Sequence, residues 1–213
     1  MTDVARLVDL GWGPYWQALF DSSETAHGRP ARVVRGDRGS SLVATAKGVV
    51  RAKPSVRLLK AAGDAGDLPV VGDWVVVRDS EGLDVPLIDA VLERKSAIVR
   101  GDSGRTSSRQ VLVANIDTAF VVDPVAASPT LRRIEREPAL AWTSGASPLV
   151  VLTKADLSSD PETARAAVVS IAPGVDVLLA NSLDCESAGQ LLPHISNQRT
   201  AVLIGPSGAG KST

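Results

Sequence analysis

The sequence is poor in the residues that form disulfides and zinc sites. Its 213 residues include one cysteine, Cys185, and two histidines, His27 and His194. A single thiol cannot form a disulfide within the chain, and three soft or imidazole ligands are fewer than the four of a structural zinc site. These residues also lack the neighbours that a catalytic relay requires. We therefore expect neither a disulfide framework nor a zinc centre within this sequence.

Long apolar runs are also missing. No stretch approaches the ~20 consecutive apolar residues of a membrane-spanning helix, and charged residues interrupt the first ten positions at Asp3, Arg6 and Asp9. With 44% hydrophobic and 22% charged residues, the composition is that of a globular chain. We expect a cytoplasmic monomer that does not contact membranes, and a length of 213 residues favours two small domains.

Net charge is nearly absent, at -1, but the charges are unevenly distributed. Residues 29–60 contain nine basic side chains and one acidic one, whereas residues 61–93 contain eight acidic side chains and one basic one. A cationic segment of this kind indicates either a polyanion-binding face or neighbouring strands that neutralise each other. Aromatic residues, at 3%, are too scarce for a stacking platform. The candidate RNA-binding residues are Arg32, Arg35, Arg38, Lys47, Arg51, Lys53, Arg57 and Lys60.

Five short β-branched segments lie between residues 30 and 95: RVVR, SLVATA, VVRA, DWVVV and DVPLIDAVL. The separators GDRG, KG, GDAGD and DSEG supply the residues that tight turns require. This pattern predicts a small all-β barrel, first an OB-fold and alternatively an SH3-like barrel. Residues 1–29 are predicted to be an N-terminal arm that packs on the barrel.

The second half has a different periodicity. Residues 101–109, GDSGRTSSR, lack apolar side chains, and we predict a linker over 96–115. Continuous apolar runs follow at 117–122, 148–152, 175–180 and 200–204, as expected for buried parallel strands. One helix is predicted from Pro161 to before Pro173, and another from Ser128-Pro129 with a kink or break at Pro138. Residues 116–213 therefore predict a partial α/β domain.

The last apolar run leads into a glycine-rich segment that matches G-x-x-x-x-G-K-[ST]. Glycines let such a backbone wrap around a phosphate, while the lysine neutralises the phosphates and the following serine, Ser212, binds Mg²⁺. The candidate phosphate-binding residues are Gly205, Pro206, Ser207, Gly208, Ala209, Gly210, Lys211, Ser212 and Thr213.

A candidate base-reading segment follows the run at 148–152. The carboxylate of Asp156 suits guanine, whose N1–H and 2-amino group are adjacent donors, and it would be left unpaired by adenine. The stem of Lys154 can lie along the purine, and the next apolar run ends at Asn181-Ser182, where a backbone amide can reach guanine O6.

The base-reading segment here precedes the phosphate loop, the reverse of the usual order in small GTPases. In this order, and in the segments LGW, VVGDWVVV, VLERKSAIVR, QVLVANIDTAFVV, VLTKADL and IGPSGAGKST, the sequence resembles the circularly permuted GTPases that depend on the small ribosomal subunit. The resemblance implies an OB domain, a permuted GTPase domain and a further zinc-binding domain. It also implies GTP or GDP and Mg²⁺ as ligands, and the small ribosomal subunit and its rRNA as partners during late subunit maturation.

Carried over by motif, the resemblance implies that guanine is bound by Thr153, Lys154, Asp156, Asn181 and Ser182. Thr153 stands where many members have asparagine, and EREP at 135–138 replaces the more usual Arg-Tyr-Leu. The switch segments and zinc domain are not in this sequence, so we expect it to hydrolyse GTP negligibly by itself and leave the catalytic residue unassigned. Two alternatives are a non-enzymatic RNA-binding module with a structural nucleotide site and an ATP-dependent P-loop kinase or ATPase.

Overall fold

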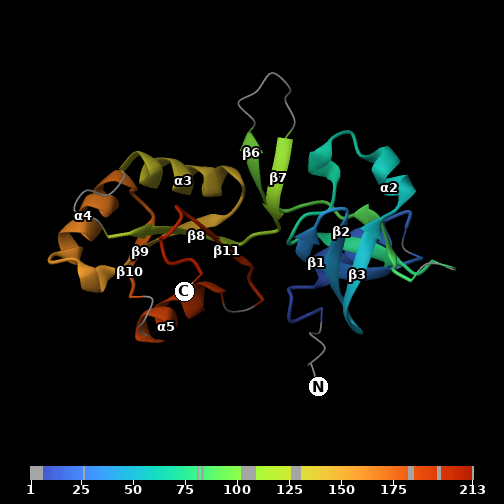
Figure 1. Cartoon of the computed structure of the whole chain (residues 1–213), viewed down its shortest axis with the longest axis horizontal. Helices are drawn as coiled ribbons and strands as arrows, with labels where there is room; N and C mark the ends of the chain where they lie inside the picture. The colour runs from blue at the N-terminus through green and yellow to red at the C-terminus, as the bar shows by residue number, and fades with distance from the viewer. Residues whose placement is uncertain are drawn as a thin grey trace. The chain divides into compact units, whose positions relative to one another are not determined.

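A computed structural model describes residues 7–25, 27–80, 82, 84–101, 109–125, 131–181, 185–195 and 198–212. The chain forms two compact units, residues 1–115 and 116–213 (Figure 1). None of the described helices has both the length and the apolar character needed to cross a membrane.

The first unit contains a closed five-stranded barrel. Its strands are β1 (Arg29–Asp37), β2 (Ser40–Thr45), β3 (Gly48–Pro54), β4 (Trp74–Arg78) and β5 (Leu87–Val91). They pair in the order β1-β2-β3-β5-β4, and β3 and β5 are parallel while the other described pairs are antiparallel. The predicted OB-fold-like barrel is confirmed. Its closure removes the unpaired strand edges that an open sheet would expose.

The two faces of β4 pack on different cores. Val75 and Val77 face the barrel interior together with Val33, whereas Trp74 packs outside it against Trp16. Trp16 belongs to α1 (Pro14–Asp21), so the N-terminal segment covers one wall of the barrel. The connection between β3 and β4 contains α2 (Val56–Ala61) and the short 3-10 helix η1 (Ala65–Asp67).

The segment 96–115 differs from the linker that we expected. It contains the antiparallel strands β6 (Ala97–Gly101) and β7 (Arg109–Ala114), and residues 102–108 lie outside the described residues. The inner ends of both strands are buried at Ile98 and Ala114, and the Ala114 amide donates to the carbonyl of Val71. The β6–β7 pairing and the burial of Ile98 and Ala114 therefore give regular structure to residues that we expected to form a linker.

The second unit is a four-stranded parallel sheet in the order β10-β9-β8-β11. The strands are β8 (Thr118–Pro124), β9 (Ser147–Thr153), β10 (Asp176–Leu179) and β11 (Ala201–Ile204). Helices α3 (Leu131–Thr143) and α4 (Pro161–Ile171) cover one face, and α5 (Cys185–Ile195) lies on the other (Figure 1). The predicted α/β architecture is confirmed.

Helix α4 begins as the sequence predicts, whereas α3 differs from its prediction. Asp160 caps α4 as predicted, since its carboxylate accepts a hydrogen bond from the amide of Thr163 at 3.0 Å. Of the kink or break predicted at Pro138, the break is wrong, because α3 continues through it. Burial of Ile134 and Ala141 on either side compensates for the one helical hydrogen bond that proline removes.

Candidate nucleotide-binding site

Three strands of the second unit end at the same edge of the sheet. Strands β9, β10 and β11 belong to one parallel sheet, so the segments that follow Thr153, Leu179 and Ile204 all leave from its carboxyl edge. Open α/β sheets bind ligands at this edge. The structure thus brings Lys154–Asp156, Ala180–Asn181 and the glycine-rich loop to one rim.

Glycine is required at three positions of the loop. Gly205 has φ of 149°, and a Cβ there would lie 2.0 Å from the carbonyl oxygen of Val122 on β8. Gly208 and Gly210 have φ of 77° and 88°, in the left-handed region that side chains disfavour. The loop therefore packs directly on a strand backbone and turns sharply, as an anion-binding nest of backbone amides does.

Lys211 folds back over the loop. Its Nζ donates hydrogen bonds to the carbonyl oxygens of Gly205 at 3.0 Å and Pro206 at 2.5 Å. A phosphate oxygen is a stronger acceptor than a neutral carbonyl because it is charged. Lys211 is therefore positioned at the loop and can exchange these carbonyls for a phosphate.

The residues present fit a magnesium ion that is held mainly by a nucleotide. Ser212 is exposed beside Lys211, and Thr213 lies outside the described residues. Within the described ranges, no three His, Cys, Asp or Glu side chains gather as a metal cluster. Mg²⁺ takes few protein ligands at phosphate sites and draws the rest from phosphate oxygens and water. The Ser212 hydroxyl would be such a protein ligand.

Thr153 connects the base-reading segment to the phosphate loop. Its hydroxyl donates a 2.7 Å hydrogen bond to the carbonyl of Ala209, and both residues are buried. A Cβ on Gly210 would lie 3.8 Å from the Thr153 side chain. Sequence reasoning noted the missing asparagine amide here but not that the threonine hydroxyl makes this connection. Thr153 and Ala209 are 56 residues apart, so no local sequence pattern indicates their contact.

Asp156 presents a free carboxylate at the rim. Lys154 adopts the left-handed conformation, with φ of 59°, and precedes the 3-10 helix η2 (Ala155–Leu157). The Ala155 amide donates to the carbonyl of Ala180 at 3.4 Å, which ties this turn to the end of β10. Asp156 is exposed, and no described residue bonds to its carboxylate. It is therefore available to a ligand.

The third segment of the rim is held by a residue that sequence reasoning missed. The amide of Asn181 donates to Oγ of Ser187 on α5 at 3.0 Å, and the amide of Ala180 donates to the carbonyl of Leu152 at 2.8 Å. Both amides thus have protein acceptors, and Ser182 lies outside the described residues. The spacing of Ser187 from Asn181 carries no motif that would have identified this contact.

Known proteins that resemble this chain identify its family. The family model described as RsgA GTPase matches residues 91–213, more than half of the chain. The chain belongs to the RsgA GTPase family. Among curated RsgA relatives it is similar to the small ribosomal subunit biogenesis GTPase of Streptomyces coelicolor, 42% identical over 98% of this chain and 56% of the relative. The corresponding protein of Opitutus terrae is 36% identical over 97% of this chain and 59% of its own length.

Two solved structures share the fold. YloQ, described as a circularly permuted GTPase, has a TM-score of 0.64 and 23% identity over 88% of this chain and 63% of its own. YjeQ from Thermotoga maritima has a TM-score of 0.66 and 20% identity over 86% and 62%. This RsgA family chain thus spans a little more than half the length of the curated relatives that it matches.

A partly buried charged cluster of this RsgA family chain joins the end of β8 to α3. Arg133 lies 3.8 Å from the Asp123 carboxylate and 3.6 Å from that of Glu137. Burial raises the pKa of both acids, and Arg133 opposes the shift in each case; the Lys211 charge also opposes it at Glu137. Oε2 of Glu137 is buried without a hydrogen-bond partner. In the sequence, Asp123 directly follows the apolar run at 117–122, and this position is the feature that could have indicated the cluster.

The RNA-binding candidates of the barrel divide into three groups. Arg32 is 8% exposed and donates hydrogen bonds to the carbonyls of Gly72 and Leu10, so its charge cannot reach RNA and it leaves the candidate set. Arg35, Arg51 and Arg57 are exposed but form ion pairs. The exposed candidates that pair with no described acid are Arg38, Lys47, Lys53 and Lys60.

Proposed function

We propose that this chain supplies the barrel and the nucleotide-binding part of a GTPase that assists late maturation of the small ribosomal subunit. The supporting observation is the hydrogen bond from Thr153 to Ala209, because it joins a base-reading segment and a phosphate loop at one rim of the sheet. The curated relatives carry the corresponding description. The proposed setting is the bacterial cytoplasm, with the protein acting as a monomer.

The proposed site divides the nucleotide between two segments. The backbone N–H groups between Gly205 and Ser212, Pro206 having none, and the Lys211 ammonium hold the phosphates. The Ser212 hydroxyl would hold a Mg²⁺ ion, which would neutralise phosphate charge when bound. Asp156 accepts hydrogen bonds from guanine N1–H and the 2-amino group, while the Lys154 stem covers the base. Thr153 keeps the two segments in register, and residues 181–182 complete the base pocket.

We also propose that residues 1–213 bind GTP but hydrolyse it negligibly by themselves. Phosphoryl transfer needs groups that position the attacking water and stabilise the developing charge, in addition to the phosphate loop. The chain spans 56% of the Streptomyces coelicolor relative. We assign those groups to the part of the relatives that this sequence does not match.

Titration with GDP, ADP and xanthosine diphosphate tests the base-reading role. The chain should bind GDP more tightly than ADP. The Asp156→Asn variant should instead bind xanthosine diphosphate more tightly than GDP, because an amide matches the N1–H donor and 2-oxo acceptor of xanthine. Asp160→Asn is the matched control, since Asp160 is an exposed helix cap outside the rim. Equal affinities for GDP and ADP would remove the guanine role and favour the ATP-dependent alternative.

For the barrel we propose contact with rRNA through the exposed cations. Arg38, Lys47, Lys53 and Lys60 are exposed and form no salt bridge with a described acid, which suits the phosphate backbone of RNA. The test is the slope of affinity against salt for a small-subunit rRNA fragment, which should decrease with each cation replaced by glutamine. RNA affinity that is the same with GDP and a non-hydrolysable GTP analogue would favour the non-enzymatic RNA module over a nucleotide-controlled factor.

A further inference from the structure

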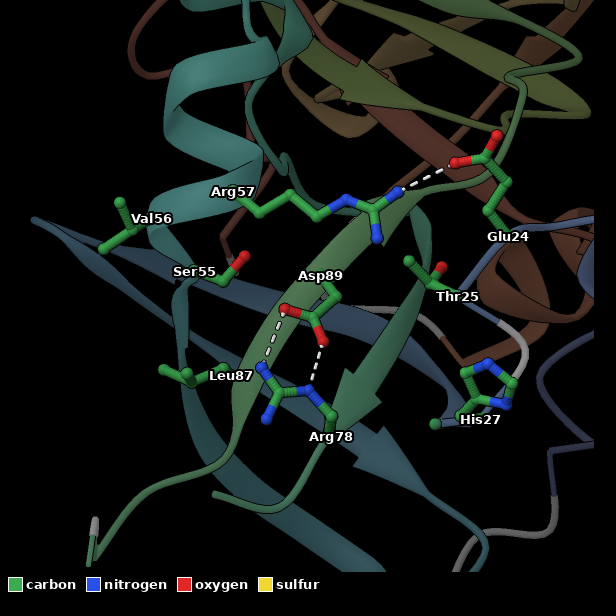
Figure 2. Close-up of a pocket in the computed structure, with 10 residues that line it drawn as sticks. Glu24, Thr25, His27, Ser55, Val56, Arg57, Arg78, Leu87 and Asp89 are labelled. Carbon is green, nitrogen blue, oxygen red and sulfur yellow. Dashed lines mark hydrogen bonds and ion pairs between the residues drawn. The ribbon is translucent and has the colours of Figure 1, made fainter. Parts of the chain in front are cut away.

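A pocket lies on the barrel unit and contains none of the candidate nucleotide-binding residues. It has a volume of about 330 Å³, at the lower end of the roughly 300–1,000 Å³ of small-molecule sites. Its lining comes from the segment after α1, from β3–α2 and from the facing ends of β4 and β5 (Figure 2). Its charged side chains are Glu24, Arg57, Arg78 and Asp89.

One ion pair forms a fixed, flat part of the wall. Arg78 donates from Nε to Oδ2 of Asp89 at 2.6 Å and from Nη2 to Oδ1 at 3.4 Å. The Asp89 side chain is 9% exposed, whereas that of Arg78 is 47% exposed. The buried carboxylate therefore holds the guanidinium in place while leaving part of it open. An immobilised guanidinium plane is a surface on which an unpaired nucleobase stacks.

The other ion pair is easily opened. Arg57 donates to Oε2 of Glu24 at 3.0 Å, and their side chains are 60% and 88% exposed. Exposed pairs of this kind contribute little to stability, so an anion can replace Glu24 at low cost. A phosphate would form a charge-assisted, bidentate contact that the glutamate does not make here.

The remaining lining suits a nucleotide that has one apolar and one polar side. Val56 and Leu87 lie on one side of the pocket, and His27 lies on the other (Figure 2). The apolar pair can cover the edge of a base, and the imidazole can bond to its polar edge or to ribose. The same β3–α2 segment carries the exposed cations Lys53 and Lys60, which connects the pocket with a surface already suited to RNA.

We propose that this pocket binds one unpaired nucleotide of an RNA strand, with the base on the Arg78–Asp89 pair and the phosphate on Arg57. The proposal deepens the RNA contact proposed above and rests on it. It assigns that contact a base-binding position, whereas the exposed lysines contribute only charge.

The first test is titration of the chain with uridine 5′-monophosphate, followed by amide chemical shifts. Millimolar nucleotide should shift the amides of Gly28, Ser55 and Asp89, and Arg57→Gln should weaken binding roughly tenfold, as expected for loss of a hydrogen bond to a charged group. Lys60→Gln, which removes a charge from the same helix outside the pocket, should leave it unchanged. If no pocket amide shifts, or if ribose 5-phosphate produces the same shifts, nucleotide recognition is refuted.

The second test uses RNA. The chain should bind oligouridylate more tightly than an abasic strand of the same length. Arg78→Lys, which keeps the charge but loses the flat guanidinium, should remove that difference, whereas Arg57→Gln and Lys60→Gln should weaken binding of both strands. GDP affinity, measured on each variant, reports an intact nucleotide site. Loss of RNA binding with uridine monophosphate binding retained would refute the RNA surface, and the reverse would refute the pocket alone.

Discussion

Replacement of Thr153 by valine isolates the hydrogen bond that joins the two halves of the nucleotide site. Valine has nearly the shape of threonine but cannot donate a hydrogen bond to the carbonyl of Ala209, a residue that is fully buried. A buried acceptor left without a partner costs about 1–3 kcal/mol. We expect the free energy of unfolding to fall by an amount in this range.

Nucleotide affinity should fall as well. GDP binding requires the phosphate loop in its present position. If holding the loop there costs the valine variant about 1.4 kcal/mol, its affinity for GDP falls about tenfold. Thr153→Ser is the matched control, since it keeps the hydroxyl and loses only a methyl group. Equilibrium titration with labelled GDP and chemical unfolding measure the two quantities. Wild-type affinity and stability in the valine variant would show that the 2.7 Å contact does not hold the loop.

Three further substitutions test the fold around the site and the barrel. Gly205→Ala should abolish GDP binding and lower the melting temperature, because its Cβ would lie 2.0 Å from the Val122 carbonyl oxygen; retained binding would contradict the tight packing. Arg94→Met should destabilise the barrel by about 3 kcal/mol at neutral pH, since it leaves the buried Asp73 carboxylate without its bidentate partner. Burial already raises the pKa of Asp73, so in urea unfolding the deficit should shrink on acidification as that group protonates. Asp123→Asn should stabilise the second unit at neutral pH, because it replaces a carboxylate whose charged form is disfavoured by burial. Its folded-state pKa is raised by burial, so the wild-type chain loses stability as pH rises through that value, and the two proteins should converge in acid.

The sequence by itself determined the architecture and the order of the motifs. Short β-branched segments between turn residues predicted the barrel, and continuous apolar runs predicted a parallel sheet, because segment length, turn residues and apolar continuity are local features of the sequence. The glycine-rich segment was also readable, since positive φ and close backbone approach at Gly205, Gly208 and Gly210 exclude most other residues. These features depend on local conformation and burial, which neighbouring residues encode.

The tertiary structure decided what depends on segments far apart in sequence. Thr153 reaches Ala209 and Asp89 holds Arg78 only because the folded strands bring them together. Arg32 has the same charge as the exposed cations, yet its strand position turns it into the protein, where backbone carbonyls bind it. Likewise, Pro138 opposes a helix locally, but packing of the surrounding turns on the sheet outweighs that preference.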